Sequence, residues 1–408
     1  MDALTLPSNW QRVRLGDIAE IKRGASPRPI ENPKWFCANS NVGWVRISDI
    51  SKNSRFLYKT AQKLSKKGIE KSRFIKQNSL IMSMCATIGK PIITKIDTCI
   101  HDGFVVFENP KIDLNYLYYF LCYIEKEWLE SGQQGSQVNL NVDLIKNKEV
   151  FCPKDLNEQI AIANILSGLD HYLYSLDALI LKKESVKKAL SFELLSQRKR
   201  LKGFNQNWQR VRLGDIGITI SGLAGKTKQD FINGNAKYIT FLNVLNNVII
   251  DTSILENVKI YPNEKQNSFK KYDLFFNTSS ETPKEVGMCA VLLDDIDQVF
   301  LNSFCFGFRI FDKAVDSLFL SYLINSEIGR KAFENLAQGS TRYNLSKSGF
   351  NNICLFLPPL NEQIAIANIL SDLDSEIISL KNKKRQFENI KKALNHDLMS
   401  AKIRALKK

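Results

Sequence analysis

Two long segments of the chain carry apolar residues at alternating steps of four and three positions. The apolar members of this stripe are Ile162, Leu166, Leu169, Leu173, Leu176 and Ile180 in the first segment, and Ile366, Leu370, Leu373, Ile377, Leu380 and Phe387 in the second. A heptad stripe sustained over roughly four repeats is typical of a coiled coil rather than of a helix in a globular core. We therefore expect two helices that pair through this seam, each a rod of roughly 60 Å for about 40 residues.

The sequence also indicates where these helices begin and where their seam is interrupted. A proline-containing turn precedes each helical segment, and Asn157 and Asn361 are the expected N-caps. Four seam positions carry lysine instead of an apolar residue, namely Lys183, Lys187, Lys384 and Lys391. We expect these lysines to interrupt the apolar seam and to extend their charged ends into solvent, the alternative being that they mark where another protein docks.

The rest of each half mixes shorter patterns. Runs of β-forming residues occupy 44–47, 80–82 and 104–107 in the first half, and 238–241, 274–276 and 304–308 in the second. Helical apolar spacing follows at 114–130 and at 318–337. The pattern predicts an α+β fold in which a small domain with a twisted sheet is followed by a long helix, twice over.

Identical segments show that the chain is an internal duplication. Residues 9–18 recur without change at 207–216, and residues 157–167 recur without change at 361–371. A period of about 200 residues is far too long for a solenoid and fits a duplicated domain pair.

The two copies differ most between these identical segments. Residues 24–110 and 222–310 show almost no similarity to each other. Neutral drift of loops would have blurred the identical segments as well. We therefore interpret the chain as one structural frame used twice, with two different ligand surfaces.

Composition narrows the class of protein. The chain has 408 residues and a formal net charge of +15, which favours two to four domains and a polyanionic partner. No apolar run approaches the ~18 residues of a membrane span, and the first residues lack the features of a signal peptide. Eight cysteines without a C-x-x-C pair favour reduced thiols in a cytoplasm over a disulfide framework or a zinc site.

Catalytic motifs are missing where the sequence can be checked for them. Residues 222–227 resemble a phosphate-binding loop but have two residues between their glycines, where that motif needs four. The chain also lacks the Asn/Asp-Pro-Pro-aromatic tetrapeptide and the Gly-x-Gly loop of methyltransferases, and it has only three histidines. We expect it to catalyse no reaction and to hold no metal or cofactor.

Binding of DNA is the remaining hypothesis. Lys and Arg neutralise phosphates, while Arg, Asn and Gln read base edges in the major groove. The candidate contacts are Arg23, Lys34, Trp35, Arg46, Lys52 and Arg55 in the first half, and Lys226, Lys228, Lys237, Asn243, Asn246, Lys284, Arg342 and Tyr343 in the second.

The order of the motifs resembles the specificity subunit of type I restriction-modification enzymes. Trp-x-x-(Val/Arg)-x-Leu-Gly-Asp precedes each variable domain, and Pro-Leu-Asn-Glu-Gln-x-x-Ile opens the long helix. Residues 339–346 and 358–363 match the family pattern closely, whereas the first copy departs from it at 135–140 and 152–156. The resemblance covers essentially the whole chain.

This resemblance implies a non-catalytic subunit of a restriction endonuclease and adenine methyltransferase complex that serves host defence. Two target-recognition domains would each bind half of a split double-stranded DNA site, with two long helices forming an antiparallel coiled coil in a pseudo-twofold circular arrangement. The expected segments are recognition domain 1 at 1–154, spacer 1 at 155–200, recognition domain 2 at 201–358 and spacer 2 at 359–408. Two methyltransferase subunits and the nuclease-translocase subunits would join this scaffold, and S-adenosylmethionine, ATP and magnesium would belong to those partners.

Three other functions fit parts of the sequence. A single-chain DNA-modifying enzyme is disfavoured by the missing motifs. A coiled-coil scaffold that binds only proteins would show no salt-dependent affinity for DNA. An RNA-binding module is disfavoured because the strands lack an aromatic RNP-type motif.

Overall fold

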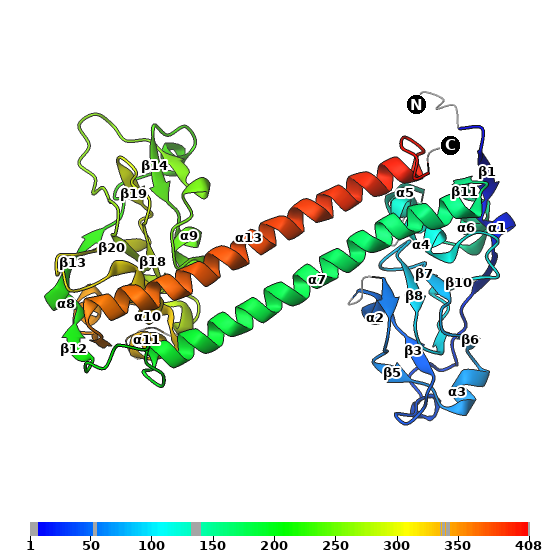
Figure 1. Cartoon of the computed structure of the whole chain (residues 1–408), viewed down its shortest axis with the longest axis horizontal. Coiled ribbons are helices and arrows are strands. Elements are labelled where there is room, and N and C mark those ends of the chain that lie inside the picture. The colour runs from blue at the N-terminus through cyan, green and yellow to red at the C-terminus, as the bar shows by residue number, and fades with distance from the viewer. Residues whose placement is uncertain are drawn as a thin grey trace. The chain divides into compact units, whose positions relative to one another are not determined.

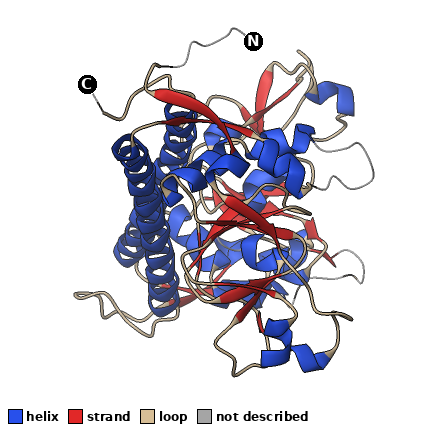
Figure 2. Ribbon diagram, turned by 90° about the vertical axis from the view of Figure 1, so that its right-hand side faces the viewer, coloured by secondary structure: helices blue, strands red, loops and turns tan. Residues whose placement is uncertain are grey.

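The computed structural model describes residues 7–51, 55–131, 140–334, 336, 339 and 343–406 of the chain. The chain divides into two compact units: unit 1 comprises Met1–Asp177 with Lys383–Lys408, and unit 2 comprises Ala178–Asn382. Each unit contains a domain of mixed strands and short helices together with part of each long helix (Figure 1). Figure 2 shows this mixture, with strands in red and helices in blue. The predicted tandem α+β organisation is confirmed.

Unit 1 is built on three sheets. Its strands are β1 (Trp10–Arg14), β2 (Glu20–Arg23), β3 (Gly43–Val45), β4 (Phe56–Leu57), β5 (Gln62–Lys63), β6 (Arg73–Ile75), β7 (Leu80–Ser83), β8 (Pro91–Thr94), β9 (Thr98–Ile100), β10 (Phe104–Glu108) and β11 (Glu149–Pro153). Its short helices are α1 (Leu15–Ile18), η1 (Pro33–Trp35), α2 (Ile47–Ser51), α3 (Lys66–Glu70), α4 (Leu114–Tyr123), α5 (Glu125–Ser131) and α6 (Val142–Asn147). The strand orders are β2-β10-β7-β8-β4, β5-β3-β9-β6 and β1-β11.

Unit 2 has three similar sheets and a further two-stranded sheet. Its strands are β12 (Gln209–Arg212), β13 (Gly217–Ser221), β14 (Ala236–Ile239), β15 (Glu256–Val258), β16 (Leu274–Asn277), β17 (Ser279–Ser280), β18 (Cys289–Val291), β19 (Val299–Leu301), β20 (Cys305–Ile310), β21 (Tyr343–Asn344) and β22 (Cys354–Leu357). Its short helices are α8 (Leu213–Ile216), η2 (Lys228–Phe231), α9 (Phe241–Asn246), η3 (Thr252–Ile254), η4 (Pro283–Glu285), α10 (Ser317–Asn325), α11 (Glu327–Glu334) and α12 (Lys347–Asn351). The strand orders are β13-β20-β16-β18, β15-β14-β19, β12-β22 and β17-β21.

Strand pairing matches the two units element by element. The order β2-β10-β7-β8 corresponds to β13-β20-β16-β18, and the parallel pair β3–β9 corresponds to β14–β19. The pair β1–β11 corresponds to β12–β22, both antiparallel. The duplication seen in the sequence is therefore a duplication of topology, including the sheets whose sequences differ.

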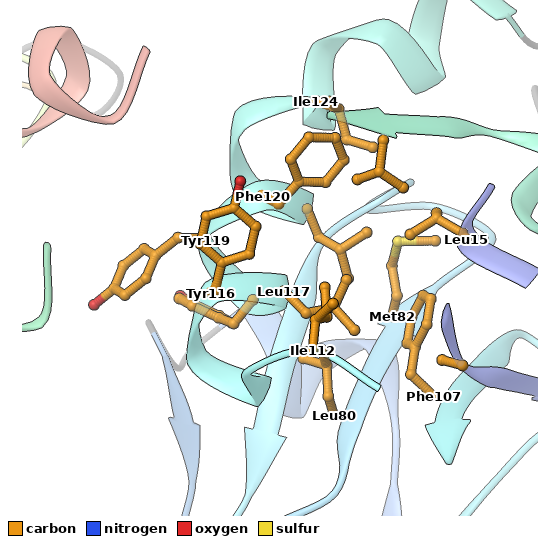
Figure 3. Packing of buried hydrophobic residues seen from close by; sticks show 14 of the residues in the cluster. Leu15, Leu80, Met82, Phe107, Ile112, Tyr116, Leu117, Tyr119, Phe120 and Ile124 are labelled. Carbon is orange, nitrogen blue, oxygen red and sulfur yellow. The ribbon is translucent and has the colours of Figure 1, made fainter. Parts of the chain in front are cut away.

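Helix α4 packs on the large sheet of unit 1 and supplies much of its core. Asp113 fixes the start of this helix, because its carboxylate accepts a hydrogen bond of 2.8 Å from the backbone N–H of Tyr116. Figure 3 shows the buried cluster formed by Leu15, Leu80, Met82, Phe107, Ile112, Leu117, Phe120 and Ile124. The strands β7, β8 and β10 of this sheet are buried on both faces, which explains their continuous apolar runs.

Two of the predicted strands end earlier than expected. The runs at 44–47 and 238–241 leave the sheet after Val45 and Ile239, and a short helix begins at Ile47 or Phe241. The cause is capping of the short helix that follows each strand, which the β-forming side chains do not predict. The backbone N–H of Arg46 donates to Asp49, and the Thr240 hydroxyl accepts from the backbone N–H of Asn243.

The predicted long helices are confirmed as α7 (Leu156–Leu195) and α13 (Leu360–Met399), but their predicted N-caps are wrong. Asn157 and Asn361 lie inside the first turn. In α7 the carboxylate of Asp155 accepts a hydrogen bond of 2.9 Å from the backbone N–H of Asn157. In α13 the carbonyl of Pro359 accepts from the backbone N–H groups of Glu362 and Gln363.

The two helices run antiparallel within each unit. In unit 1, Asp170 pairs with Lys391 and Asp177 with Lys384, so residue numbers rise on one helix as they fall on the other. In unit 2, Lys183 pairs with Glu376 and Lys187 with Asp374 in the same sense. The apolar seam residues named from the sequence are buried or half-buried. The seam lysines do not extend into solvent as expected, because each of them bonds to a carboxylate of the facing helix.

Candidate nucleic-acid interface

The Asn-Glu-Gln segment that opens each long helix joins the helices to the small domain. Glu158 is buried, and its carboxylate accepts two hydrogen bonds from Arg404, at 2.7 and 3.2 Å. Glu362 is buried in the same way and accepts two hydrogen bonds of 2.7 Å from Arg200. Each arginine follows the C-terminal end of the facing helix, so the two ends of the helix pair are held alike.

The glutamine next to each glutamate has an equally specific structural role. Gln159 donates to the carbonyl of Pro153 at 2.8 Å and accepts from the backbone N–H of Asp113 at 2.9 Å. Gln363 repeats both bonds, to Pro358 and Asp316, at the same distances. The motif therefore ties the last strand of the domain, the start of α4 or α10 and the long helix together.

Three of the unit 1 candidates for DNA contact lie on the surface. Arg23, Lys34 and Arg46 are exposed. The ammonium of Lys34 lies 4.3 Å from the ring centroid of Trp35, which is itself buried. Trp35 thus positions a cation and does not offer a free stacking face.

Arg46 borders a hollow that the sequence did not reveal. Its guanidinium donates to the side-chain carbonyl of Gln62 at 2.9 Å, and both residues line an open pocket of about 440 Å³ with Glu31 and Phe36. Arginine, glutamine and glutamate are side chains that read base edges. Gln62 escaped the sequence reasoning because only the pairing of β3 with β5 brings it beside Arg46.

Arg55, by contrast, lies inside unit 1. It is 7% exposed, and its guanidinium donates to Tyr119, Ser167 and Asn115 at 2.6–2.8 Å. In Figure 3 the side chain of Tyr119 points away from the other labelled residues, and its hydroxyl donates to Asp170 on α7. The structure therefore places Arg55 in an internal network that joins the small domain to the long helix, not on a DNA-binding surface.

Unit 2 likewise has both exposed and internally bonded candidates for DNA contact. The exposed ones are Lys228, Lys237, Asn246 and Lys284. Lys226 is only 5% exposed and bonds to Glu264, and this hydrogen bond lowers the pKa of the Glu264 carboxyl to about 2. Asn243 is fully buried and holds the backbone of Asp251. Lys226 and Asn243 are thus engaged within the domain.

Of the three remaining candidates for DNA contact, the structure describes only Tyr343. Tyr343 is half-buried in the short strand β21, which pairs with β17. Lys52 and Arg342 lie outside the described residues.

Two arrangements of potentially reactive side chains can be checked in the described part of the chain. Among the described residues, no group of three or more His, Cys, Asp or Glu side chains is placed to hold a metal ion. Cys85 and His101 approach each other beside Gly103, but burial raises the pKa of the thiol and lowers the pKa of the imidazole. Both groups are therefore neutral near pH 7, which is the opposite of an activated thiolate. None of the described helices is long and apolar enough to cross a bilayer.

Comparison with known proteins assigns this architecture. The family model described as type I restriction modification DNA specificity domain matches residues 7–183 and 205–389, one copy in each half and together most of the chain. The chain belongs to this family. The resemblance inferred from the repeated motifs is confirmed.

Individual specificity proteins match the chain over its whole length or over part of it. The chain is 26% identical over 425 residues to the type I restriction enzyme MjaVIII specificity subunit of Methanocaldococcus jannaschii, covering 99% of this chain and 95% of that protein. It is 25% identical over 168 residues to the EcoprrI specificity subunit of Escherichia coli, covering 39% of this chain and 41% of that protein. The crystal structure of the type I restriction-modification S subunit from M. genitalium shares the fold, with a TM-score of 0.61 at 15% identity over 97% of this chain and 98% of that one.

We call the segments that recur without change, residues 9–18 and 157–167 with 207–216 and 361–371, and the residues that they contact the frame. The frame also carries surface residues that are identical in its two copies. Arg12, Arg14 and Asp17 on β1 and α1 are exposed, and so are their counterparts Arg210, Arg212 and Asp215 on β12 and α8. Ile160 and Asn164 on α7 are exposed, as are Ile364 and Asn368 on α13. Folding does not require an isoleucine at an exposed helix position, so packing alone leaves this identity unexplained.

Proposed function

We propose that this specificity protein is the non-catalytic DNA-recognition subunit of a type I restriction-modification complex. Each unit would bind one half of a bipartite double-stranded DNA target. Methyltransferase and restriction subunits would assemble on the frame, and S-adenosylmethionine, ATP and magnesium would bind to those subunits. A DNA-bound complex of this kind would work in the cytoplasm.

The observation that carries the proposal is the contrast between frame and sheets. The Glu–Arg and Gln contacts of the frame recur in both units, whereas the two units expose different polar side chains on their sheet-containing domains. Lys34 and Arg46 in unit 1 have no sequence counterparts in unit 2, where Lys228, Lys237 and Asn246 are exposed instead. Two different readers on one repeated frame suit two different half-sites.

The repeated exposed surface supports two equivalent partner positions. Exposed isoleucine and amide side chains at the start of each long helix suit a protein interface, which combines apolar contacts with hydrogen bonds. Because the surface occurs once per unit, two copies of one methyltransferase subunit would bind to each chain. Arg12 and Arg210 would lie at the edge of this surface.

A domain exchange tests the DNA-reading part of the proposal. Residues 24–110 would be replaced by the corresponding segment of another family member, and the methylated sites would be mapped in cells that also express the cognate methyltransferase. We expect one half-site to change and the other to stay the same. A change in both half-sites, or in neither, would contradict one reader per unit.

A paired substitution tests the docking part. Ile160→Glu and Ile364→Glu introduce a charge at the two equivalent exposed positions. Each single variant should lose one methyltransferase subunit, and the double variant both, as measured by native mass spectrometry of the purified complex. Leu181→Glu is the matched control, because Leu181 is also exposed on α7 but corresponds to an arginine in the second copy.

A further inference from the structure

Unit 2 carries a cluster of exposed apolar side chains that does not belong to the frame. Ile218, Tyr272 and Phe311 are 54%, 56% and 61% exposed. All three line one open pocket of about 500 Å³. Residues of β13, β20 and α10 border this pocket, and Figure 1 labels these three elements. We call these three residues the apolar cluster.

Strand register identifies the equivalent place in unit 1, which is charged. Ile218 lies opposite Arg309 in the pairing of β13 with β20, and Glu20 lies opposite Glu108 in the pairing of β2 with β10. Glu20 and Glu108 both bond to Lys22, at 3.0 and 2.5 Å. Glu20 thus belongs to a set of ion pairs in unit 1, whereas its counterpart Ile218 is an exposed apolar residue in unit 2.

The other two members of the cluster have counterparts that are not large apolar side chains. Glu108 and Arg309 are equivalent in the strand register, so Pro110 corresponds to Phe311. Tyr272 precedes β16 by two positions, as Asn78 precedes β7. Unit 1 thus has Glu20, Asn78 and Pro110 where unit 2 has Ile218, Tyr272 and Phe311.

The backbone at Tyr272 shows that this difference is not favoured by folding. Its φ is +72°, and that of Asn78 is +65°. Asparagine tolerates this left-handed region, whereas a bulky aromatic residue is an outlier there. Tyr272 has a strained backbone conformation, and 56% of its surface is exposed. It therefore adds little to the stability of the fold. Such residues are found where a surface binds something.

The charge at the rim of the pocket defines what it can bind. Lys270 is exposed, and the ammonium of Lys271 lies 5.2 Å from the ring centroid of Tyr272. Asp273 offsets the charge of Arg309 through an ion pair of 2.6 Å. Two lysines beside an apolar hollow leave the site positively charged.

We propose that the apolar cluster docks an acidic segment of a protein partner. A bulky apolar side chain of that segment lies between Ile218, Tyr272 and Phe311, and flanking carboxylates pair with Lys270 and Lys271. The aliphatic and aromatic side chains suit an apolar side chain, and Asp273 and Arg309 beside them already pair with each other. Because unit 1 is charged at this place, one such segment binds per chain, in contrast with the two partner positions of the frame.

The test removes the apolar cluster and uses the unit 1 residue at two of its three positions. The swap variant carries Ile218→Glu, Tyr272→Asn and Phe311→Ser in the full chain, because a proline at 311 would lose the hydrogen bond that the backbone N–H donates to Ile216. The probes are short fluorescein-labelled peptides with two adjacent central residues drawn from Phe, Leu, Ile and Trp and with glutamates on both sides. Fluorescence anisotropy should show that at least one peptide binds to the parent chain and that the swap weakens its binding at least tenfold.

Controls make the result decisive. The same peptide with glutamine in place of glutamate should bind more weakly, and Lys270→Ser with Lys271→Ser should lower the affinity of the acidic peptide without altering the fold. Ile232→Glu, at an exposed apolar residue outside the pocket, should change nothing. The swap should leave the unfolding temperature unchanged or raise it, and it should leave binding to a DNA duplex intact.

Three outcomes would overturn the proposal. They are binding of none of the acidic peptides to the parent chain, equal binding to the swap variant, and loss of DNA affinity instead of peptide affinity in the swap variant. The last outcome would assign the surface to DNA. Half-site mapping by the domain exchange reports on the proposed recognition function separately, because it leaves the residues of the cluster in place.

Discussion

The frame and the large sheets differ in how far the two units have diverged. In the frame, Glu158 with Arg404 and Glu362 with Arg200 make the same pair of bonds. In the sheets, Met82 and Phe276 take the same register position on equivalent strands but have different neighbours. The strand order is kept in both regions. Topology therefore constrains the sheets only to be apolar inside, which leaves their surfaces free to acquire different ligands.

We expect the largest loss of stability from substitutions in the hydrophobic cores of the two units. Phe276 is fully buried among Phe306, Phe333 and Phe350, with ring centroids 4.8–6.1 Å away. Met82 is fully buried in the mixed cluster of unit 1. Phe276→Ala should destabilise unit 2 by about 3–5 kcal/mol, and Met82→Ala should destabilise unit 1 by about 2–4 kcal/mol, measured by urea unfolding. A smaller cost for Phe276→Ala than for Met82→Ala would contradict the aromatic packing described for unit 2.

The frame should respond in the same way in both units. Glu158→Gln and Glu362→Gln keep the shape of the side chain but remove the charge that Arg404 or Arg200 contacts. Each arginine is about a third exposed or less, so the cost should be about 1–3 kcal/mol, below that of a fully buried pair. Urea unfolding of the two variants should agree within about 0.5 kcal/mol. Lys331→Ala removes an exposed i,i+4 pair and should cost under about 0.5 kcal/mol.

If only one of the two glutamate substitutions lowered the free energy of unfolding, the two copies of the frame would contribute unequally to stability although their Glu–Arg bonds match. Unequal costs would trace to the bonds that only one pair makes: the Asn9 amide also donates to Glu158 at 2.7 Å, and Arg200 also donates to the carbonyl of Gln206 at 2.8 Å.

The surface cations sharpen the comparison at the level of DNA. Lys228 and Lys237 are exposed, whereas Lys226 is held by Glu264. If the exposed lysines contact phosphates, Lys228→Ala and Lys237→Ala should each reduce the slope of log K against log salt concentration by about one. Lys226→Ala should leave that slope unchanged and lower the unfolding temperature. If the slope were the same in all three variants, Lys228 and Lys237 would not contact DNA phosphates.

Sequence periodicity predicted the helices well because one stripe decides whether a long helix can pair. It did not predict the role of the seam lysines, since their carboxylate partners lie on the other helix, nearly 200 residues away along the chain. Capping by Asp49 or Thr240 ends two strands early, because the β-forming side chains of a run do not show where its backbone turns into a helix. Arg55 and Lys226 look like surface cations in the sequence, and only tertiary contacts show that they are internal. For the same reason Gln62 went unnoticed beside Arg46.

Acid should affect the two units differently, although this effect is the smallest. The three histidines of the chain, His101, His171 and His396, all belong to unit 1. Burial lowers the pKa of His101 below its ordinary value, Arg46 lowers it further, and Asp102 opposes them. The unfolded chain therefore binds a proton more readily than the folded unit does. The stability that depends on neutral His101 is present above about pH 6.5 and is lost as the pH falls below that value.

His101→Phe provides the matched variant for this pH effect. The ring of His101 lies 4.6 Å from Phe104 and 5.9 Å from Trp44, so a phenyl ring suits its surroundings. Between pH 7.5 and pH 5.5, the unfolding transition of unit 1 should shift to lower temperature in the parent chain and shift less in His101→Phe, while that of unit 2 stays nearly constant. Differential scanning calorimetry follows both transitions, and Met82→Ala identifies which of them belongs to unit 1. If unit 2 loses as much stability as unit 1, carboxylates shared by the two frames dominate the acid response and the buried imidazole does not.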